Sequence, residues 1–552
     1  MFIDARQLDN GTEIQAEVCI IGAGVAGITL ALELEKLGVS TCLLESGGLE
    51  PDDATRDLYR GESVELPYKF ADGCRSRFLG GSSNCWGGWC GLLDDHDFER
   101  REWVPHSGWP ITRTDLDPYY QRAQEALKLG PYTYAPQFWE SAIGRDDVKR
   151  LPLPSGRVRD VISQFSPPAR LGKLHGPQLR DSTSVTVYLY ANATNIETER
   201  LSAKIAHIDI ATLTGRRHTV KARVFVLATG GIENARLLLA SNKVQPAGVA
   251  NAHDLVGRYF MDHPRIVSGS IRFTQQWVSN KLFDIKFHYQ NPYIAAHGTA
   301  ISAQFALAPE TQRQEGVTNA RVWFFSRFAG EGSAAAEALT RLRRRVERKH
   351  SPEFSLPGDM LTLARHPWDA SCFVLAHFFK PQILKGEMKF QAIVEPEPDP
   401  QSRVSLGEEK DALGLNRVRV GWRLGNLTRR TFDRNFALVA AELESAGVAR
   451  VTLDPPLEGR ADWPVSLDSE GTWHHMGTTR MHDSPRQGVV DRDCKVHGVN
   501  NLFIAGSSVF PTSGANFPTT TIVALTLRLA AHLSAELKPP MAVTTNAVLR
   551  SA

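Results

Sequence analysis

Three glycines near the N-terminus have the spacing of a nucleotide-binding turn. Gly22, Gly24 and Gly27 form the pattern G-x-G-x-x-G directly after the apolar run 18–21. The first glycine permits a tight turn, the second lets a pyrophosphate approach the backbone, and the third allows the next helix to pack closely on the strand. Glu45, at the end of the following apolar run, is placed to hold ribose hydroxyls and would repel a 2′-phosphate. These residues predict a dinucleotide cofactor with free ribose hydroxyls.

The glycines do not distinguish NAD from FAD, and two later segments favour FAD. Residues 224–239, VFVLATGGIENARLLL, are typical of the second strand, glycine turn and helix that flavoproteins place near the cofactor. Residues 500–511, NNLFIAGSSVFP, predict a strand that ends in Ala505-Gly506 and a turn. We expect Gly506 and Ser507 of this turn to contact the flavin diphosphate.

The elements around these residues indicate an α/β fold that is interrupted by an antiparallel region. Residues 16–48 predict strand, helix and strand with short connections, which requires a parallel sheet, and Gly38 ends the helix. From about 266 to 465 the segments KFHYQ, RVWFFSRF and FVLAHFF are rich in aromatic residues and favour antiparallel strands around a cavity. We therefore expect a Rossmann-like FAD-binding domain with an inserted substrate-binding domain.

The predicted division of the chain follows this change of character. The FAD-binding domain is assigned three segments, of which the last carries the catalytic residues: 1–135, 181–265 and 470–540. A connecting or substrate-side segment (136–180), the substrate-binding domain (266–469) and a flexible tail (541–552) complete the chain.

Composition excludes several classes of function. The 552 residues carry a net charge of +2, whereas a nucleic-acid-binding protein would show a strong basic excess. The seven cysteines include no C-x-x-C pair, so no metal site is predicted. The N-terminus lacks the apolar core of a signal peptide, and no run of about eighteen apolar residues occurs, which favours a cytoplasmic enzyme without a transmembrane segment. The basic stretch 341–350, RLRRRVERKH, is either a solvated helix face or a docking face for an acidic partner or a membrane.

Six segments in order resemble the glucose–methanol–choline (GMC) family of FAD-dependent oxidoreductases over nearly the whole chain. They are FLGGSSNCWGG (78–88), ATGGIENARLLLAS (228–241), GRYFMDHP (257–264), EPEPDPQSRVSL (395–406), HHMGTTRM (474–481) and SGANFPTTTIVALTLRLA (513–530). The arrangement is more similar to sugar-oxidising members, such as pyranose oxidases and fructose or aminoglycoside dehydrogenases. The resemblance implies oxidation of a CH–OH group of a sugar, glycoside or other polyol, with oxygen, a quinone or another molecule as acceptor. A homo-oligomer is also compatible with it.

Oxidation of an alcohol requires a base for the hydroxyl proton, and the resemblance assigns this base to His474. Histidine suits the task because its unperturbed pKa lies near neutrality. The resemblance places Asn516 opposite this histidine across the substrate oxygen, where an amide can donate and accept. Neighbouring residues of an extended segment point to opposite sides, so only one of His474 and His475 should face the flavin. His475 is assigned to the substrate side, and His263, in MDHP, is interpreted as structural or at the site edge.

The loop 80–88 is expected to bring bare backbone close to the cofactor, since glycine tolerates positive φ. Its predicted cofactor contacts, with Thr519 added at the flavin pyrimidine edge, are Gly81, Ser82, Asn84, Trp86 and Gly87. Cys85 stands where pyranose oxidase-like relatives carry a histidine that binds FAD covalently. A non-covalent FAD is therefore predicted, with a thioether to Cys85 as the alternative.

Trp323 is the principal predicted substrate contact of the inserted domain. Further candidates are Phe324, Phe325, His377 and Phe378. Glu395 and Arg403 are assigned an architectural role in the substrate-domain sheet. Two other functions stay open: an FAD-retaining lyase that cleaves cyanohydrins, and a flavoprotein subunit that passes electrons to a partner.

Overall fold

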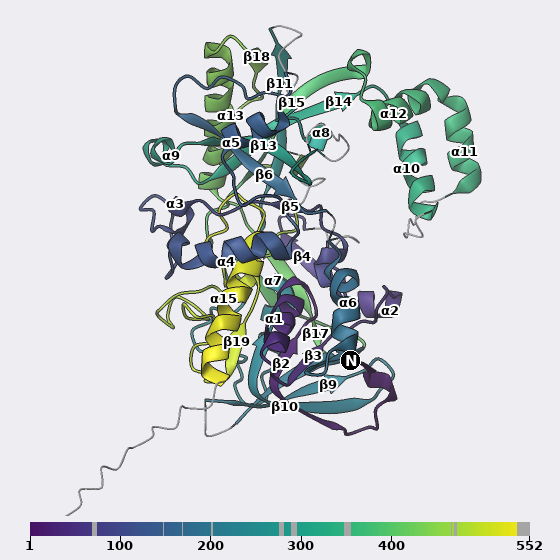
Figure 1. Ribbon diagram of the computed structural model, residues 1–552, viewed down its shortest axis with the longest axis vertical. Helices are drawn as coiled ribbons and strands as arrows, with labels where there is room; N and C mark the ends of the chain where they lie inside the picture. Colours follow the sequence, from purple (N-terminus) through teal and green to yellow (C-terminus); the bar gives the residue numbers. More distant parts are fainter. Residues whose placement is uncertain are drawn as a thin grey trace, which may run out of the picture.

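The computed structural model shows two stacked parts and a projecting arm (Figure 1). The lower part contains the N-terminal strands and helix α1, and the upper part contains a second sheet. The arm consists of the helices α10 (Ala334–Val346), α11 (Leu356–Arg365) and α12 (Pro367–Phe379). The structure describes residues 1–68, 74–146, 148–167, 169–199, 203–274, 281–288, 295–346, 355–464, 466–467 and 472–537. The predicted tail, 541–552, and residues 347–350 of the basic stretch lie outside the described residues.

The first sheet carries the predicted parallel unit. Its strand order is β1-β7-β3-β2-β10-β9-β8, with β19 paired to β10. The strands are β1 (Phe2–Asp4), β2 (Glu13–Ile21), β3 (Thr41–Leu44), β7 (Val185–Leu189), β8 (Asn192–Thr198), β9 (Ile205–Ala211), β10 (Arg217–Leu227) and β19 (Leu502–Ile504). β2 pairs in parallel with β3 and β10, and β10 pairs in parallel with β19. The predicted strand–helix–strand unit and the return of the C-terminal segment to this sheet are confirmed.

Helices cover the first sheet and lead the chain back to it. α1 (Val25–Lys36) connects β2 to β3 and is followed by Gly38 at φ +67°, a left-handed conformation that glycine adopts at low cost. α7 (Gly230–Ala240) follows β10 in the same way. The C-terminal helix α15 (Thr519–Leu537) packs against α1 and α4 (Arg113–Ala126).

The second sheet is antiparallel, as expected for the inserted region. Its order is β18-β11-β15-β14-β13-β6-β5, with β12 paired to β13. The strands are β5 (Trp89–Cys90), β6 (Val158–Phe165), β11 (Arg265–Phe273), β12 (Ala295–Ala296), β13 (Thr299–Leu307), β14 (Ala320–Phe328), β15 (Lys385–Val394) and β18 (Ala449–Thr452). Helix α13 (Asn426–Ser445) packs on β13, β14 and β15. A third sheet joins β16 (Arg403–Lys410), β17 (Asn416–Trp422) and β4 (Gly61–Glu65).

Two of the expected strands are wrong. FVLAHFF, 373–379, is the second half of α12, which begins with Pro367 in its first turn, where a missing N–H costs nothing. KFHYQ begins in the short helix α8 (Ile285–His288), and its last two residues lie outside the described part of the chain. FVLAHFF is an apolar run, which has no periodicity that separates a strand from a helix, and KFHYQ is too short for its alternation to decide between them. RVWFFSRF is β14, as expected.

The strand ends meet where a cofactor would bind. The carboxyl ends of the parallel strands β2, β3, β10 and β19 lie on one edge of the first sheet, the usual ligand edge of such sheets. One continuous buried core extends through both sheets. Within the described residues, no helix has the length and apolar character that crossing a bilayer would need.

Candidate active site

A cavity of about 490 Å³ joins the two sheets. Gly22 and Glu45 line it at the edge of the first sheet, and Trp323 and Ile393 line it from β14 and β15 of the second. Ten of the twelve predicted cofactor contacts lie on its wall: Gly22, Gly24, Glu45, Gly81, Ser82, Trp86, Gly87, Gly506, Ser507 and Thr519. Gly27 and Asn84 are the two that do not.

The glycine turn leaves room for a dinucleotide. Gly22 adopts φ +105°, and a Cβ there would lie 2.7 Å from the carbonyl oxygen of Ala228. Gly27 packs tightly against the turn itself. A Cβ on it would lie 1.9 Å from the carbonyl oxygen of Gly22, so this position has no room for a side chain. A Cβ on Gly24 would meet nothing closer than Gly81 Cα at 3.9 Å, so its missing side chain keeps space open beside the start of α1. The residues therefore fit a pyrophosphate held on bare backbone and a helix N-terminus.

Glu45 lies at the same end of the cavity with its carboxylate fixed. Its Oε1 accepts from the backbone N–H of Gly47 at 2.9 Å, and its Oε2 accepts from that of Ala23 at 3.2 Å. Burial raises the pKa of Glu45, and these two N–H groups oppose that effect. The carboxylate thus has a defined orientation at the predicted ribose position.

The loop after Gly80 closes over the turn. Gly80 (φ +103°) begins a short 3₁₀ helix, Gly81–Asn84. The side-chain amide of Asn84 donates to the Leu79 carbonyl at 3.0 Å, within this loop. Cys85 lines the cavity, and its thiol donates to the Ser82 carbonyl at 3.3 Å. Burial raises the pKa of Cys85, which keeps the thiol protonated.

A buried carboxylate holds the segment that carries His474. Asp262 Oδ1 accepts from the backbone N–H of His474 at 2.8 Å and from the Thr472 hydroxyl. Its Oδ2 accepts from the Trp473 N–H at 3.0 Å and from the Tyr68 hydroxyl at 2.8 Å. These bonds support Trp473 at φ +57°, a backbone conformation that is unusual for a bulky residue. Asp262 was not singled out from the sequence, although it directly precedes His263 in MDHP.

The imidazole of His474 is bonded to that of His263. Their Nδ1 atoms lie 2.9 Å apart, and His263 Nε2 lies 2.7 Å from the carbonyl oxygen of Gly514. A carbonyl only accepts, so His263 carries its proton on Nε2 and its Nδ1 is an acceptor. His474 must then donate from Nδ1, which leaves its Nε2 without a proton. His474 also lines the cavity, so the arrangement presents a base to it.

Both rings are held neutral. Burial lowers the pKa of His263 to about 4. Burial, together with the nearby His263 and Arg265, lowers the pKa of His474 well below its ordinary value. A neutral His474 that donates from Nδ1 carries no proton on Nε2.

His475 also contributes to the cavity wall, but its surroundings differ from those of His474. Its ring lies between Tyr68 and Phe260, with ring centroids 5.9 and 6.1 Å away. Burial lowers its pKa to about 3, and its Nε2 is buried without a hydrogen-bond partner among the described residues. Its carbonyl accepts from Ser507 at 2.7 Å, which ties the histidine segment to the C-terminal glycine turn.

The ring of Phe517 lies next to that of His474. Asn516 is buried, its amide donates to the Leu92 carbonyl, and it is not among the residues that line the cavity. Phe517 packs edge-on to the His474 ring at 5.7 Å and stacks on Trp89 at 4.6 Å. Phe517 was not predicted as a site residue, and only its place beside Asn516 pointed to it.

Aromatic residues form the wall on the side of the second sheet. A small apolar cluster consists of Trp89, Phe165, Trp323, Ile393 and Phe517. Trp323 lies on the cavity wall, as predicted for a substrate contact, and its Nε1 donates to Gln391 at 2.8 Å. The other aromatic candidates do not line the cavity: Phe324 is in the core, Phe325 lies beside Lys286, and His377 and Phe378 are on the arm.

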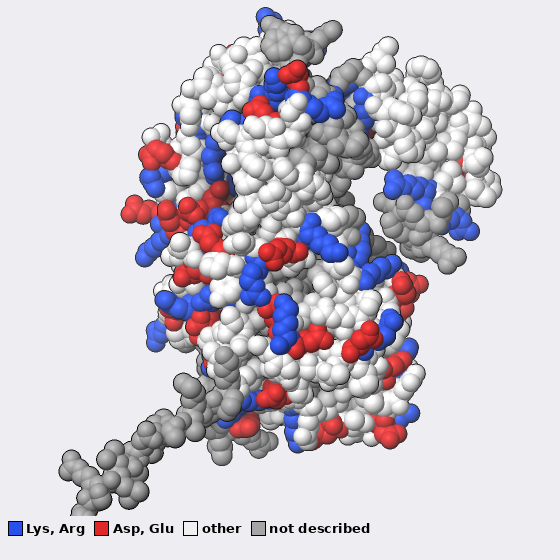
Figure 2. Space-filling view, viewed as in Figure 1, with Lys and Arg blue, Asp and Glu red and all other residues white. Residues whose placement is uncertain are grey.

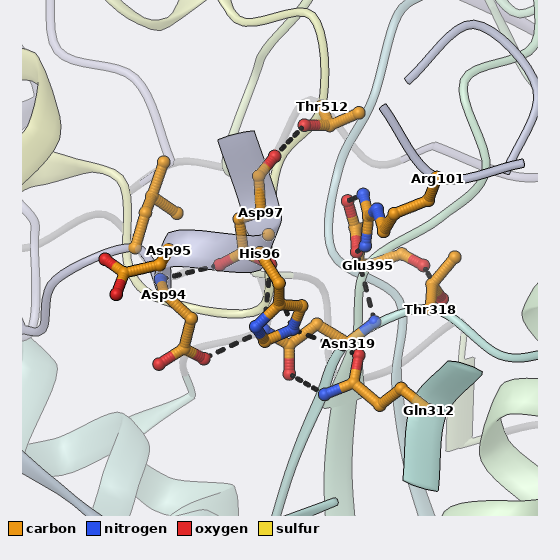
Figure 3. A network of polar contacts seen from close by, with 12 residues as sticks. Asp94, Asp95, His96, Asp97, Arg101, Gln312, Thr318, Asn319, Glu395 and Thr512 are labelled. Atoms are coloured by element: carbon orange, nitrogen blue, oxygen red, sulfur yellow. Dashed lines mark hydrogen bonds and ion pairs between the residues drawn. The ribbon is translucent and has the colours of Figure 1, made fainter. Parts of the chain in front are cut away.

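A buried polar network supports the loop that holds Gly514 (Figure 3). Asp97, on the short helix α3 (Asp95–Phe98), accepts from Asn319 at 2.9 Å, and its carbonyl accepts from Thr512 at 3.0 Å. Beside it Arg101 forms a bidentate ion pair with Glu395, at 2.7 and 2.6 Å. Burial alone would raise the pKa of Glu395, but the Arg101 guanidinium holds it below its ordinary value. Arg403, by contrast, pairs with Asp254.

Comparisons with known proteins match both ends of this site. A family model described as FAD binding domain matches residues 15–54, which confirms the FAD prediction, and one described as GMC oxidoreductase matches 398–526. The fructose dehydrogenase large subunit of Gluconobacter japonicus is 24% identical, over 95% of this chain and 99% of that protein. The 2-methyl-1,2-propanediol dehydrogenase of Mycolicibacterium austroafricanum is 26% identical, over 94% and 95%. A crystal structure of formate oxidase shares the fold, with a TM-score of 0.54 and 16% identity over 96% of this chain and 99% of that one.

Proposed function

This chain belongs to the GMC oxidoreductase family and binds FAD, and from that premise we propose that it oxidises a CH–OH group of a sugar, glycoside or other polyol. The observation that carries the proposal is the single cavity shared by the nucleotide-binding glycines and the proton-free Nε2 of His474. One end fits the adenosine of the cofactor, and the other presents a base to a hydroxyl group.

His474 is the base in this proposal. FAD, when bound, supplies the hydride acceptor. His474 Nε2 accepts the hydroxyl proton of the substrate, and His263 accepts from His474 Nδ1 throughout. His263 therefore positions the ring and selects its tautomer, while the Gly514 carbonyl in turn selects the tautomer of His263. A positive charge that forms on His474 strengthens the bond to His263, since charged donors make stronger hydrogen bonds.

The aromatic wall of the cavity suits a polyhydroxylated substrate. Trp89, Trp323 and Phe517 present aromatic surface on which the C–H face of a sugar ring can pack. Arg265, at the start of β11, also lines the cavity and supplies hydrogen-bond donors for hydroxyl oxygens. Relatives named for fructose and for a propanediol support a substrate with neighbouring hydroxyl groups.

We also propose that FAD is held without a covalent bond. A thioether would require the Cys85 thiolate, whereas burial raises the pKa of this thiol and its proton is directed at the Ser82 carbonyl. Release of all flavin absorbance into the supernatant after acid precipitation is the expected result. Flavin that stays with the pellet, and is released by Cys85→Ser, would contradict it.

An anaerobic flavin-reduction screen tests the function. The FAD-loaded protein is mixed with ketoses, aldoses, glycosides, amino sugars and 1,2-diols, and the oxidised flavin absorbance is followed. Bleaching by a polyol is expected. Turnover without bleaching would identify a lyase, and bleaching with only simple monohydric alcohols would exclude the polyol assignment. Repetition with oxygen and with quinones then identifies the acceptor.

A further inference from the structure

The arm exposes an unusual concentration of apolar side chains. Fifteen large apolar residues of the described chain are exposed, and nine of them lie within residues 356–383. These nine, called here the arm face, are Leu356, Met360, Leu361, Trp368, Val374, Leu375, Phe378, Phe379 and Ile383. Single exposed apolar residues are ordinary on a protein surface, but a contiguous group indicates an interaction site.

Helix α12 is apolar on both of its sides. Cys372 and Ala376, each 2% exposed, pack inward, whereas Trp368, Phe378 and Phe379 are 74%, 69% and 75% exposed. A helix that is apolar all round needs cover on both faces. Helix α10 of the arm and strand β14 of the second sheet contact α12, whereas the side of α12 that carries the exposed aromatic residues has no cover within the chain's described residues.

The arm also carries positive charge. Residues 334–379 contain seven Lys or Arg and five Asp or Glu, an excess as large as the net charge of +2 of the whole chain. Arg343, Arg345 and Arg365 are exposed, while Asp359 is buried and paired with Arg341 at 2.6 Å. Figure 2 shows the visible side of the arm as mostly uncharged, with Lys and Arg at its lower end. Two arms of the same sign would repel each other, which disfavours a second copy as the cover.

We propose that the arm face docks on the surface of an anionic lipid bilayer. Trp368, Phe378 and Phe379 enter the headgroup region, and the exposed arginines lie against lipid phosphates. Aromatic and aliphatic residues beside basic ones are the composition that binds such interfaces. The arm is a helical projection from the upper part of the molecule, so it can lie on a membrane without distortion of the cofactor domain (Figure 1).

Vesicle flotation of the FAD-loaded protein tests this proposal. We expect flotation with vesicles that contain phosphatidylglycerol, little with phosphatidylcholine alone, and a loss of binding as salt increases. The double variant Trp368→Asp with Phe379→Asp should lower partitioning onto the vesicles at least about tenfold, because two aromatic side chains no longer enter the bilayer. Arg343→Glu with Arg345→Glu should lower it about tenfold for anionic vesicles. Leu37→Asp is the matched control, since Leu37 is 51% exposed but lies at the end of α1, and it should bind like the parent.

Flavin absorbance and substrate-dependent bleaching, which should match those of the parent, verify that each variant is folded. Absence of flotation with anionic vesicles, or flotation that the aromatic double variant retains, would overturn the proposal. Equal binding to neutral vesicles would also overturn it. If sedimentation shows a dimer that the same variant dissociates, and vesicles do not bind, the arm face belongs to a second copy instead.

Discussion

His263 and His474 meet through their Nδ1 atoms at 2.9 Å, although 211 residues separate them in the chain. The bond fixes both tautomers because His263 Nε2 is already directed at the Gly514 carbonyl. Most of the predictions below test this arrangement and the groups that hold it in place.

Loss of the base should nearly abolish flavin reduction. His474→Ala removes the acceptor for the substrate hydroxyl proton, so the rate of flavin reduction should fall by about two to four orders of magnitude. Anaerobic stopped-flow absorbance measures it. If reduction survives within a few-fold in His474→Ala but is lost in His475→Ala, the proton acceptor is His475.

Loss of the positioning histidine should have a smaller and recoverable effect. His263→Ala leaves His474 Nδ1–H without its acceptor, a cost of about 1–3 kcal/mol, or roughly a 5- to 150-fold slower reduction. His263→Asn offers a carbonyl oxygen to the same N–H and should recover part of the rate. Equal rates for the two variants would mean that His263 only fills space.

The pH profile should show an acid limb displaced to low pH. Only neutral His474 accepts a proton, and burial lowers its pKa well below the ordinary value of about 6.5. The reduction rate should therefore stay constant as pH falls to about 6.5, and should decline only below it. An acid limb centred at or above 6.5 would show that a different group is the base.

Substitutions at two glycines of the N-terminal turn should affect cofactor binding and folding differently. Gly24→Ala places its Cβ 3.9 Å from the nearest atom, so the protein should fold but bind FAD more weakly. Gly27→Ala places its Cβ 1.9 Å from the Gly22 carbonyl oxygen and should lower stability as well. Flavin titration and thermal unfolding distinguish the two variants. If Gly24→Ala binds FAD as tightly as the parent, the cofactor does not contact the backbone at Gly24.

The buried ion pair beside the site should contribute to stability. Glu395→Gln removes the carboxylate that is ion-paired with the Arg101 guanidinium, which is 1% exposed at its side chain. The expected loss is about 3–5 kcal/mol in the free energy of unfolding. Denaturant unfolding followed by fluorescence measures it, and Asp254→Asn, at the more exposed pair with Arg403, is the matched control. If both variants lose a similar free energy of unfolding, the buried pair contributes no more to stability than the exposed one.

Local patterns predicted the cofactor end well, and distant contacts explain what they missed. The glycine turn, α1 and Glu45 follow one another within thirty residues, so spacing alone determines their geometry. The partner of His474 depends on how β11 and the loop after residue 512 come together, which no local pattern encodes. The orientation of Asn516 depends on the Leu92 carbonyl, which lies 424 residues away in sequence. FVLAHFF is the second half of helix α12, and its aromatic residues Phe378 and Phe379 are exposed among the described residues, so they do not form the wall of a cavity as expected.

The chain of hydrogen bonds ends on a backbone carbonyl, and this limits where a proton can go. Gly514 cannot take up the proton that His263 directs at it, because an amide oxygen is not basic enough. The two imidazoles therefore store one proton and do not conduct it onward. In the proposed reaction, a proton that His474 takes from the substrate therefore leaves on the cavity side of the ring, to water or to the electron acceptor.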